Sequence, residues 1–264
     1  MTALATTHPL ATDHFNMGRI AAVASGKGGV GKTWFAITLA HALARQGRRV
    51  LLFDADLGLA NVDIQLGLTP ELDLGSVMSG AATLPDAIEH FVPGGFDVLA
   101  GRSGSGSLAA LDPQALERLL SLLCSTAGRY DTVLLDCGAG LDRSVRRMAA
   151  WSDTLLVVAT EEPTSLTDAY ATLKLHAADR PGSDARVVVN QASTPAAGAR
   201  TAATLTRACL AFLGRAPIIA GTVRRDGHVQ DAIRRQTPLL TRYPNCPASQ
   251  DVERIAASLT SPSS

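Results

Sequence analysis

The fold of this chain is decided by nine residues near its start, Ser25-Gly26-Lys27-Gly28-Gly29-Val30-Gly31-Lys32-Thr33. They contain the frame G-x-x-x-x-G-K-[ST] of a phosphate-binding loop, filled by Gly26, Gly31, Lys32 and Thr33. The glycines let backbone N–H groups turn inward around phosphates, and Lys32 can reach the β and γ oxygens. The Thr33 hydroxyl is placed to ligate Mg²⁺ at the start of a helix whose dipole favours anions.

The residues on both sides of the loop have the pattern that this motif requires. Residues 19–24 form a short apolar run that predicts a buried strand. After the loop, apolar residues keep helical spacing up to Gly47, a typical C-terminal stop. The alternative is a glycine-rich surface turn without a ligand. The order strand, loop, helix favours the phosphate-binding loop.

Lys27 is a basic residue that the motif does not need. The chain has only three lysines (Lys27, Lys32 and Lys174) and 21 arginines. Where arginine is used nearly everywhere, a lysine suggests that a compact point charge is required at that position. We therefore single out Lys27 as well as Lys32.

Composition and length favour one α/β domain. The chain has 264 residues, 46% of them hydrophobic and 4% aromatic, so we expect an aliphatic core. Strands that are apolar throughout predict a mostly parallel, doubly wound sheet with helices on both faces. We expect a single domain over residues 18–260, with disordered tails at 1–17 and 261–264. No run is long enough to span a bilayer, and residues 1–17 lack the features of a secretory signal.

The expected elements follow from apolar runs and from helix caps. Strands are predicted at 19–24, 49–53, 96–100, 132–135, 154–159, 186–189 and 217–220. Helices are predicted from residue 32 to about 46, and at 83–91, 113–127, 142–151, 164–179, 196–213, 227–236 and 249–259, with a loop at 101–107.

Candidate site residues follow the ends of the predicted strands. Asp136 closes the run Val133-Leu134-Leu135, as a Walker-B carboxylate does when it holds Mg²⁺ through water; a turn or cap residue is the alternative. Gly138 lies just beyond and can let a backbone N–H approach a γ-phosphate. Ligands of parallel sheets sit at the carboxyl ends of the strands.

Two further strand ends carry polar side chains. Asp54 and Asp56 flank Ala55, so in an extended chain both carboxylates point to the same side. One can serve the metal and the other can orient an attacking water, or both are solvated turn residues. Asn190 follows Val187-Val188-Val189 and can read an adenine edge or form an Asx-turn.

Charge and cysteine usage exclude several classes of function. The formal net charge is zero, which gives no global attraction to nucleic acid or anionic lipid. The arginine groups at 143–147, 224–225 and 234–235 are interpreted as solvated helix faces, with a DNA-binding surface as the alternative. The four cysteines are scattered without a C-x-x-C pair, which favours reduced thiols in a cytoplasm over disulfides or zinc.

The segment Lys27-Gly-Gly-Val-Gly-Lys-Thr33 resembles the deviant Walker A loop of the MinD/ParA ATPases, and the likeness extends over residues 19–260. Within that family, three segments are most similar to the flagellar number regulators of the FlhG (FleN, YlxH) group. They are Asp54-Ala-Asp-Leu-Gly-Leu-Ala-Asn-Val-Asp63, Asp136-Cys-Gly-Ala-Gly-Leu141 and Glu162-Pro-Thr-Ser-Leu-Thr-Asp-Ala-Tyr170.

The resemblance implies an ATP-dependent switch. Two subunits are expected to close around two ATP·Mg²⁺, each Lys27 reaching the partner's phosphates much as an arginine finger does. Asp56 is expected to orient the hydrolytic water, and Thr33, Asp54 and Asp136 to hold the metal shell. Slow, partner-stimulated hydrolysis is then expected to dissociate the homodimer. The nucleotide state would thereby control the binding of flagellar partners, such as an FlhF-like GTPase or a transcription regulator.

The chain departs from the family pattern in three places. Trp34 stands where the family has a small or polar residue, so it either reports on nucleotide or packs in the core. Only Thr260–Ser264 follows the last predicted helix, so we expect no direct membrane-binding helix, and any membrane contact to run through a partner. Residues 1–18 lack an Asp-Gln-Ala element, so we expect no activation of the partner GTPase by that route.

Two alternative classes remain open at this point. The first is a ParA-type chromosome or cargo partitioning ATPase that uses the arginine groups on DNA. The second is a metal-cluster carrier of the Mrp or nitrogenase reductase kind, which needs paired cysteines that Cys137 does not supply.

Overall fold

The computed structural model describes residues 18–101 and 112–260. Its strands are β1 (Arg19–Ser25), β2 (Val50–Ala55), β3 (Ile88–Phe91), β4 (Phe96–Leu99), β5 (Thr132–Ala139), β6 (Thr154–Ala159), β7 (Asp184–Ala192) and β8 (Ile218–Arg224). Its helices are α1 (Lys32–Arg45), α2 (Val62–Leu66), α3 (Leu74–Met78), the 3-10 turn η1 (Pro85–Ala87), α4 (Pro113–Ala127), α5 (Arg143–Trp151), α6 (Pro163–Asp179), α7 (Pro195–Leu213), α8 (Gly227–Arg234), α9 (Leu239–Arg242) and α10 (Pro247–Thr260).

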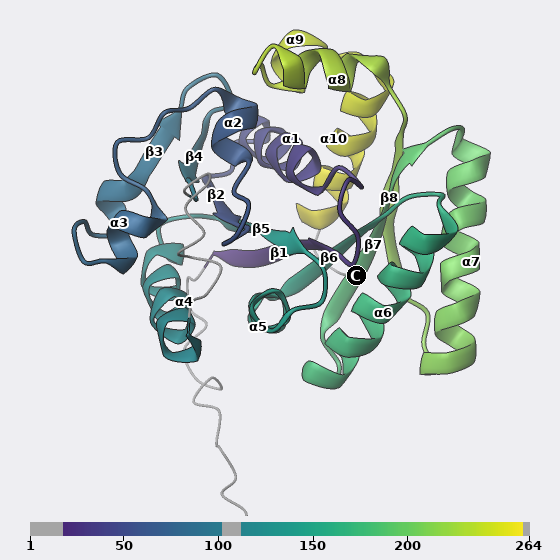
Figure 1. The fold of residues 1–264 in the computed structure, drawn as a ribbon. Coiled ribbons are helices and arrows are strands. Elements are labelled where there is room, and N and C mark those ends of the chain that lie inside the picture. Colours follow the sequence, from purple (N-terminus) through teal and green to yellow (C-terminus); the bar gives the residue numbers. More distant parts are fainter. Residues whose placement is uncertain (1–17, 102–111, 261–264) are drawn as a thin grey trace, which may run out of the picture.

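The strands form one sheet in the order β3-β4-β2-β5-β1-β6-β7-β8 (Figure 1). β3 and β4 are antiparallel, and the other neighbouring pairs are parallel. The chain adds β2 to β5 on one side of β1 within the sheet, and it then adds β6 to β8 on the other side of β1. The carboxyl end of β1 is therefore the switch point at which such sheets bind ligands.

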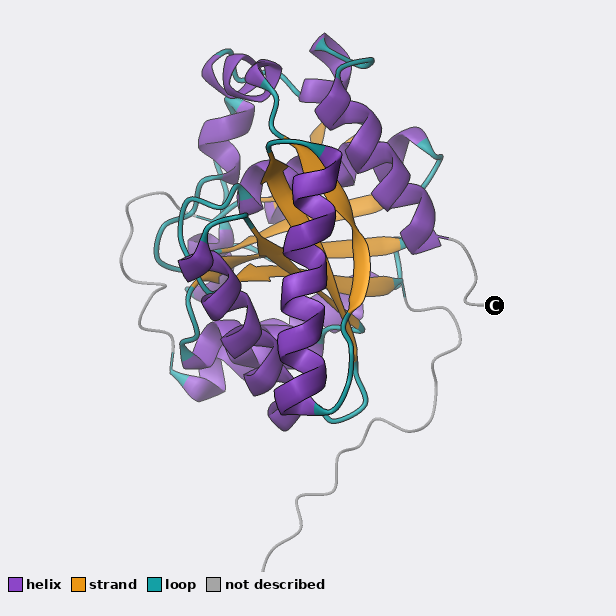
Figure 2. Cartoon of the chain, turned by 90° about the vertical axis from the view of Figure 1, so that its right-hand side faces the viewer, coloured by secondary structure: helices purple, strands orange, loops and turns teal. Residues whose placement is uncertain are grey.

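Helices cover both faces of the sheet, and two apolar cores result. α1 and α10 lie on one face with α2, α8 and α9, and their core includes Phe35 and Val252. α4, α5, α6 and α7 lie on the other face, where Leu119 and Met148 are buried. Figure 2 shows the same layering from the side. The predicted mostly parallel, doubly wound α/β fold is confirmed.

The largest local error of the sequence prediction concerns residues 83–91. They were predicted as a short helix, but only Pro85–Ala87 forms a 3-10 turn, and Ile88–Phe91 forms β3. β3 pairs with β4 through the tight turn before Phe96, where Gly95 has φ 65°. Antiparallel pairing across a glycine turn outweighs the weak helical pattern of this short segment.

The other boundaries agree with the prediction to within a few residues, although β5, β7 and β8 are longer than predicted. The short helices α2, α3 and α9 were not predicted. The tails at 1–17 and 261–264 and most of the predicted loop at 101–107 lie outside the described residues, so the domain bounds stay predictions.

Two buried histidines make a pH-dependent contribution to the stability of the fold. His41 in α1 and His176 in α6 are buried, and burial lowers the pKa of each from 6.5 to about 4, helped by Arg45 and Arg180 respectively. The unfolded chain therefore binds more protons than the folded one between these values. We expect these two histidines to lower the free energy of unfolding as the pH drops from about 6.5 to about 4. The buried Asp54 and Asp136, whose pKa values are raised to about 7 and about 6, act in the opposite sense over the same range.

Urea unfolding followed by circular dichroism over this pH range measures the effect. Relative to the wild type, the variant His41→Phe should gain stability as the pH drops across this range, because it removes a group that the unfolded chain protonates more readily than the folded chain does. A slope that His41→Phe leaves unchanged would contradict the role of His41.

Candidate functional site

The loop between β1 and α1 has the conformation that a phosphate-binding loop requires. Gly29 and Gly31 have φ values of 78° and 84°, a left-handed conformation that other residues rarely adopt. The Ser25 hydroxyl donates to the carbonyl oxygen of Lys27 at 2.7 Å, which curls the loop back on itself. α1 begins at Lys32 directly after Gly31, so its unpaired N–H groups lie at the loop.

Residues from distant parts of the sequence hold the loop in place. The Asn190 amide donates to the Val30 carbonyl at 2.8 Å, and the neighbouring Gln191 amide donates to Gly29 at 3.4 Å. A Cβ at Gly26 would lie 2.7 Å from the Cβ of Asp168 on α6. Asn190 therefore positions the loop, and its predicted contact with adenine stays a prediction.

Replacing Gly31 with alanine should destabilise the protein. The added Cβ would lie 2.6 Å from Asn190 Nδ2, and the residue would keep a left-handed φ. Such strain costs about 1–3 kcal/mol and should lower Tm by roughly 5 °C. Gly28→Ala is the matched control, because a Cβ there meets nothing within 4 Å. Calorimetry of both variants checks this, and equal Tm values would contradict it.

Two predicted site carboxylates lie side by side at the carboxyl end of the sheet. Asp54 on β2 is the register partner of Asp136 on β5. Leu52 and Leu134, two residues earlier, belong to the core under α1, so both carboxylates face the α1 side. Burial raises the pKa of Asp54 to about 7, with a further contribution from Asp136. Burial likewise raises the pKa of Asp136 to about 6.

Asp136 has the features of a metal-facing carboxylate. Both of its oxygens are buried and have no hydrogen-bond partner at bonding distance among the described residues. Lys32 and the Thr33 hydroxyl lie close enough to lower its pKa against the larger effect of burial. A buried carboxylate is costly unless a cation or a donor satisfies it. The residues present therefore fit Mg²⁺, a hard cation that prefers oxygen ligands.

Asp54 and Asp56 also organise the segment that leads into α2. Asp54 accepts hydrogen bonds from the backbone N–H groups of Asp56, Asn61 and Val62 at 2.9 to 3.2 Å. Asp56 accepts from Leu59 N at 2.9 Å and lies beside Gly138, where a Cβ would come within 3.2 Å of its carboxylate. Their predicted roles toward metal and water stay predictions.

Lys27 is paired within its own chain. Its Nζ donates to Glu162 and, at 3.0 Å, to the Thr164 hydroxyl, both at the start of α6. The Lys27 side chain is about one third exposed, and the Glu162 side chain is 64% exposed. Sequence analysis did not single out either partner as a site residue. The sequence did contain a signal for these two partners, because both lie in the segment Glu162–Tyr170, which resembles the flagellar regulators.

Trp34 lies in the core under α1 and is only 6% exposed. It belongs to the same buried cluster as Val30, Val62 and Leu66. Its Nε1 is buried and has no hydrogen-bond partner within the described ranges. The packing role is therefore observed, and its predicted contact with nucleotide stays a prediction.

Comparison with known proteins places the chain in a family. The model of the CobQ/CobB/MinD/ParA nucleotide binding domain matches residues 21–239. The chain belongs to this family. The chain is 37% identical to the antiactivator FleN of Pseudomonas aeruginosa over 92% of this chain and 86% of FleN. It is 28% identical to the flagellum site-determining protein YlxH of Helicobacter pylori over 91% of this chain and 81% of YlxH.

A solved family structure agrees with the fold and with the predicted ligands. MinD of Pyrococcus horikoshii, complexed with Mg-ADP, matches with a TM-score of 0.77 and 25% identity over 92% of this chain and 96% of MinD. The predicted resemblance to MinD/ParA proteins and flagellar regulators is confirmed. The chain is thus a P-loop protein of the MinD/ParA ATPase family, for which a nucleotide and Mg²⁺ are the ligands.

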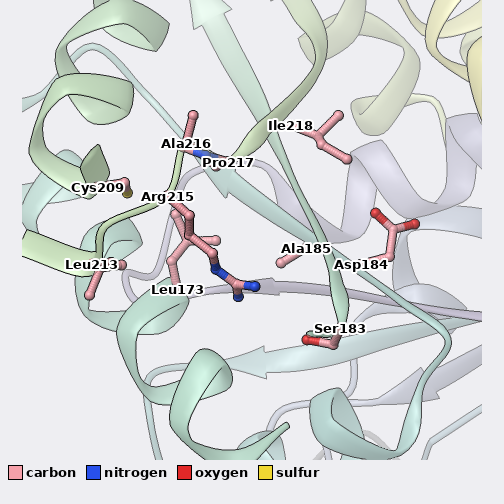
Figure 3. A pocket seen from close by; sticks show the side chains of 10 residues that line it. All are labelled: Leu173, Ser183, Asp184, Ala185, Cys209, Leu213, Arg215, Ala216, Pro217 and Ile218. Carbon is pink, nitrogen blue, oxygen red and sulfur yellow. The ribbon is translucent and has the colours of Figure 1, made fainter. Parts of the chain in front are cut away.

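The family site is distinct from the cavity in Figure 3. That cavity has about 130 Å³ and lies where β7 and β8 begin, lined by Asp184, Arg215 and Ile218 among others. The phosphate-binding loop lies at the opposite ends of the strands. Ligand pockets usually measure roughly 300–1,000 Å³, so the cavity is too small for a nucleotide.

Most of the arginine groups predicted as solvated faces are engaged in ion pairs. Arg146 pairs with Asp179 and Arg147 pairs with Glu117. The remaining pairs join Arg224 to Asp251 and Arg235 to Asp231. Such pairing weakens the alternative of a phosphate-binding DNA surface. Across the described ranges, no helix combines the length and the apolar composition needed to cross a membrane.

Proposed function

We propose that this chain is an ATP-hydrolysing switch that dimerises on ATP and regulates the number or placement of flagella. The similarity to FleN and YlxH over about nine tenths of the chain supports the flagellar role. The observation that carries the switch is the position of Lys27. Its ammonium group is directed to the surface of α6, where a second subunit can approach, and not into its own loop.

Different residues are assigned to the phosphates and to the metal ion. Backbone N–H groups of Gly26 to Thr33, with Lys32, bind the phosphates, and Gly138 approaches the γ-phosphate. Thr33, Asp54 and Asp136 hold Mg²⁺, which neutralises charge on the phosphates when it is bound. Asn190 and Trp34 support the loop from the protein side, Asn190 through the Val30 carbonyl and Trp34 from the core.

The two remaining residues act on the reaction. Asp56 orients the attacking water, and Lys27 stabilises charge on the partner's phosphates as an arginine finger does. Turnover is slow until a partner protein stimulates it, and it returns the chain to the monomer. In the monomer, Lys27 rejoins Glu162 and Thr164.

Counting flagella tests the biological part of this proposal. Deleting the gene in the organism that encodes the chain should change the number or position of flagella per cell, as seen by electron microscopy. The wild-type gene should restore the normal pattern, and the Lys27→Ala gene should not. A normal flagellar pattern in the deletion strain would reject the flagellar role and leave the ATP switch standing.

Binding to DNA distinguishes the partitioning ATPase. A non-specific DNA-binding member of the family should shift DNA at low salt in the presence of ATP, with affinity that falls steeply as salt rises. We expect no shift for this chain, because most of its grouped arginines are already paired with carboxylates.

A further inference from the structure

Three residues with metal-binding side chains converge between the start of α8 and the start of α10. Asp226 is the N-cap of α8, His228 lies in its first turn, and Cys246 directly precedes α10. One ligand atom from each lies within 4.8 Å of the other two. Cys246 is buried, the Asp226 side chain is 6% exposed, and the His228 ring is half exposed, so the cluster opens to solvent on one side.

We propose that Asp226, His228 and Cys246 form a binding site for a divalent transition metal of the zinc type. A thiolate, an imidazole and a carboxylate are all ligands of Zn²⁺, and the thiolate and the imidazole select against Mg²⁺. Three protein ligands leave a fourth tetrahedral position, which water takes on the exposed side of His228. Binding forms the metal–sulfur bond as the thiol proton leaves to solvent.

The donors are held close to the required geometry. His228 Nδ1 lies 2.8 Å from Asp226 Oδ1, and ligand atoms around tetrahedral zinc are about 3.3 Å apart. The three donors can therefore coordinate a zinc ion if these two atoms move slightly apart and the Cys246 sulfur moves toward them. The second Asp226 oxygen accepts from Ala248 N at 3.2 Å, a contact that can persist and orient the carboxylate.

Neighbouring contacts restrain the other two ligands. The His228 ring lies 4.3 Å from the Tyr243 ring, which limits its rotation. The Cys246 sulfur lies 3.3 Å from the Ser249 hydroxyl, which donates to the Tyr243 carbonyl at 2.7 Å. Because the ligands come from the starts of α8 and α10, a bound ion adds a link between these two segments, and it should stabilise the fold.

Cobalt substitution of the full chain tests the proposal without nucleotide. Co²⁺ titrated into reduced protein should bind one equivalent per chain and give a thiolate-to-cobalt charge-transfer band. Cys246→Ser should lose the band. His228→Ala, which alters an exposed side chain, should weaken binding by at least about tenfold. Cys124→Ser and His90→Ala are matched controls and should leave both the band and the affinity unchanged.

A second readout is thermal stability. Zn²⁺ should raise the Tm of the wild-type protein but not that of His228→Ala, and Mg²⁺ without nucleotide should raise neither. No cobalt band in the wild-type protein, or a band that survives Cys246→Ser, would overturn the proposal. Either result leaves the ATP switch untouched, because this site contains none of the residues to which the proposed switch gives the phosphates, the Mg²⁺ or the attacking water.

Discussion

Lys27→Ala should abolish ATP-dependent dimerisation while ATP binding by the monomer stays nearly unchanged. Lys32 and the backbone of the loop supply the contacts to the chain's own phosphates, whereas the Lys27 ammonium lies over α6. Loss of a cation that completes the partner's site should lower hydrolysis by at least roughly 10³-fold, the lower range for arginine fingers.

Light scattering with a non-hydrolysable ATP analogue measures the dimer, and a fluorescent nucleotide measures monomer binding. Lys174→Ala is the matched control, because it removes the third lysine of the chain, which is exposed on α6. The control should dimerise like the wild type. Undiminished dimers of Lys27→Ala would reject the trans role.

Asp56→Ala should trap the ATP-bound dimer. Its carboxylate lies beside Gly138 at the loop edge of the sheet, and the proposed role is to orient the attacking water. Removing such a group should lower the hydrolysis rate by roughly 10²–10⁴-fold. Binding and dimerisation should persist, because Lys27, Lys32 and Asp136 are unchanged.

Phosphate release and dimer lifetime after adding ATP·Mg²⁺ measure this effect. The dimer of Asp56→Ala should persist while that of the wild type decays. Glu71→Ala, which removes an exposed carboxylate further along the same connection, is the control and should behave like the wild type. Wild-type turnover in Asp56→Ala would show that another group orients the water.

The sequence predicted the parts of the site that local patterns define. The loop motif and the apolar strands before Asp54 and Asp136 are short-range signals, and parallel pairing brings those two strand ends together. The start of α4 was equally predictable: a helix was expected from residue 113, and Asp112 caps it there by accepting from Ala115 N at 2.7 Å.

The contacts that hold the loop could not be predicted from local sequence patterns. The bond from Asn190 to Val30 joins residues 160 positions apart, and the pair of Lys27 with Glu162 joins residues 135 apart. Such contacts depend on how β7 and α6 pack against the loop, which no local periodicity encodes. Asn190 was identified from its position after the apolar run Val187-Val188-Val189, and β7 in fact continues to Ala192; its bond to the loop carbonyl of Val30 was not predicted.

The helix predicted at 83–91 failed for a related reason. Ile88–Phe91 has too few residues for its period to be distinctive, and its antiparallel partner in β4 decides its conformation.

The contact between α6 and the loop has a mechanical consequence. Asp168, in the second turn of this helix, abuts Gly26, and the start of the same helix grips Lys27 through Glu162 and Thr164. The close approach at Gly26 limits movement of α6 toward the loop. Because the start of α6 holds the partners of Lys27, a displacement of this helix alters the position of the lysine without touching the phosphate contacts.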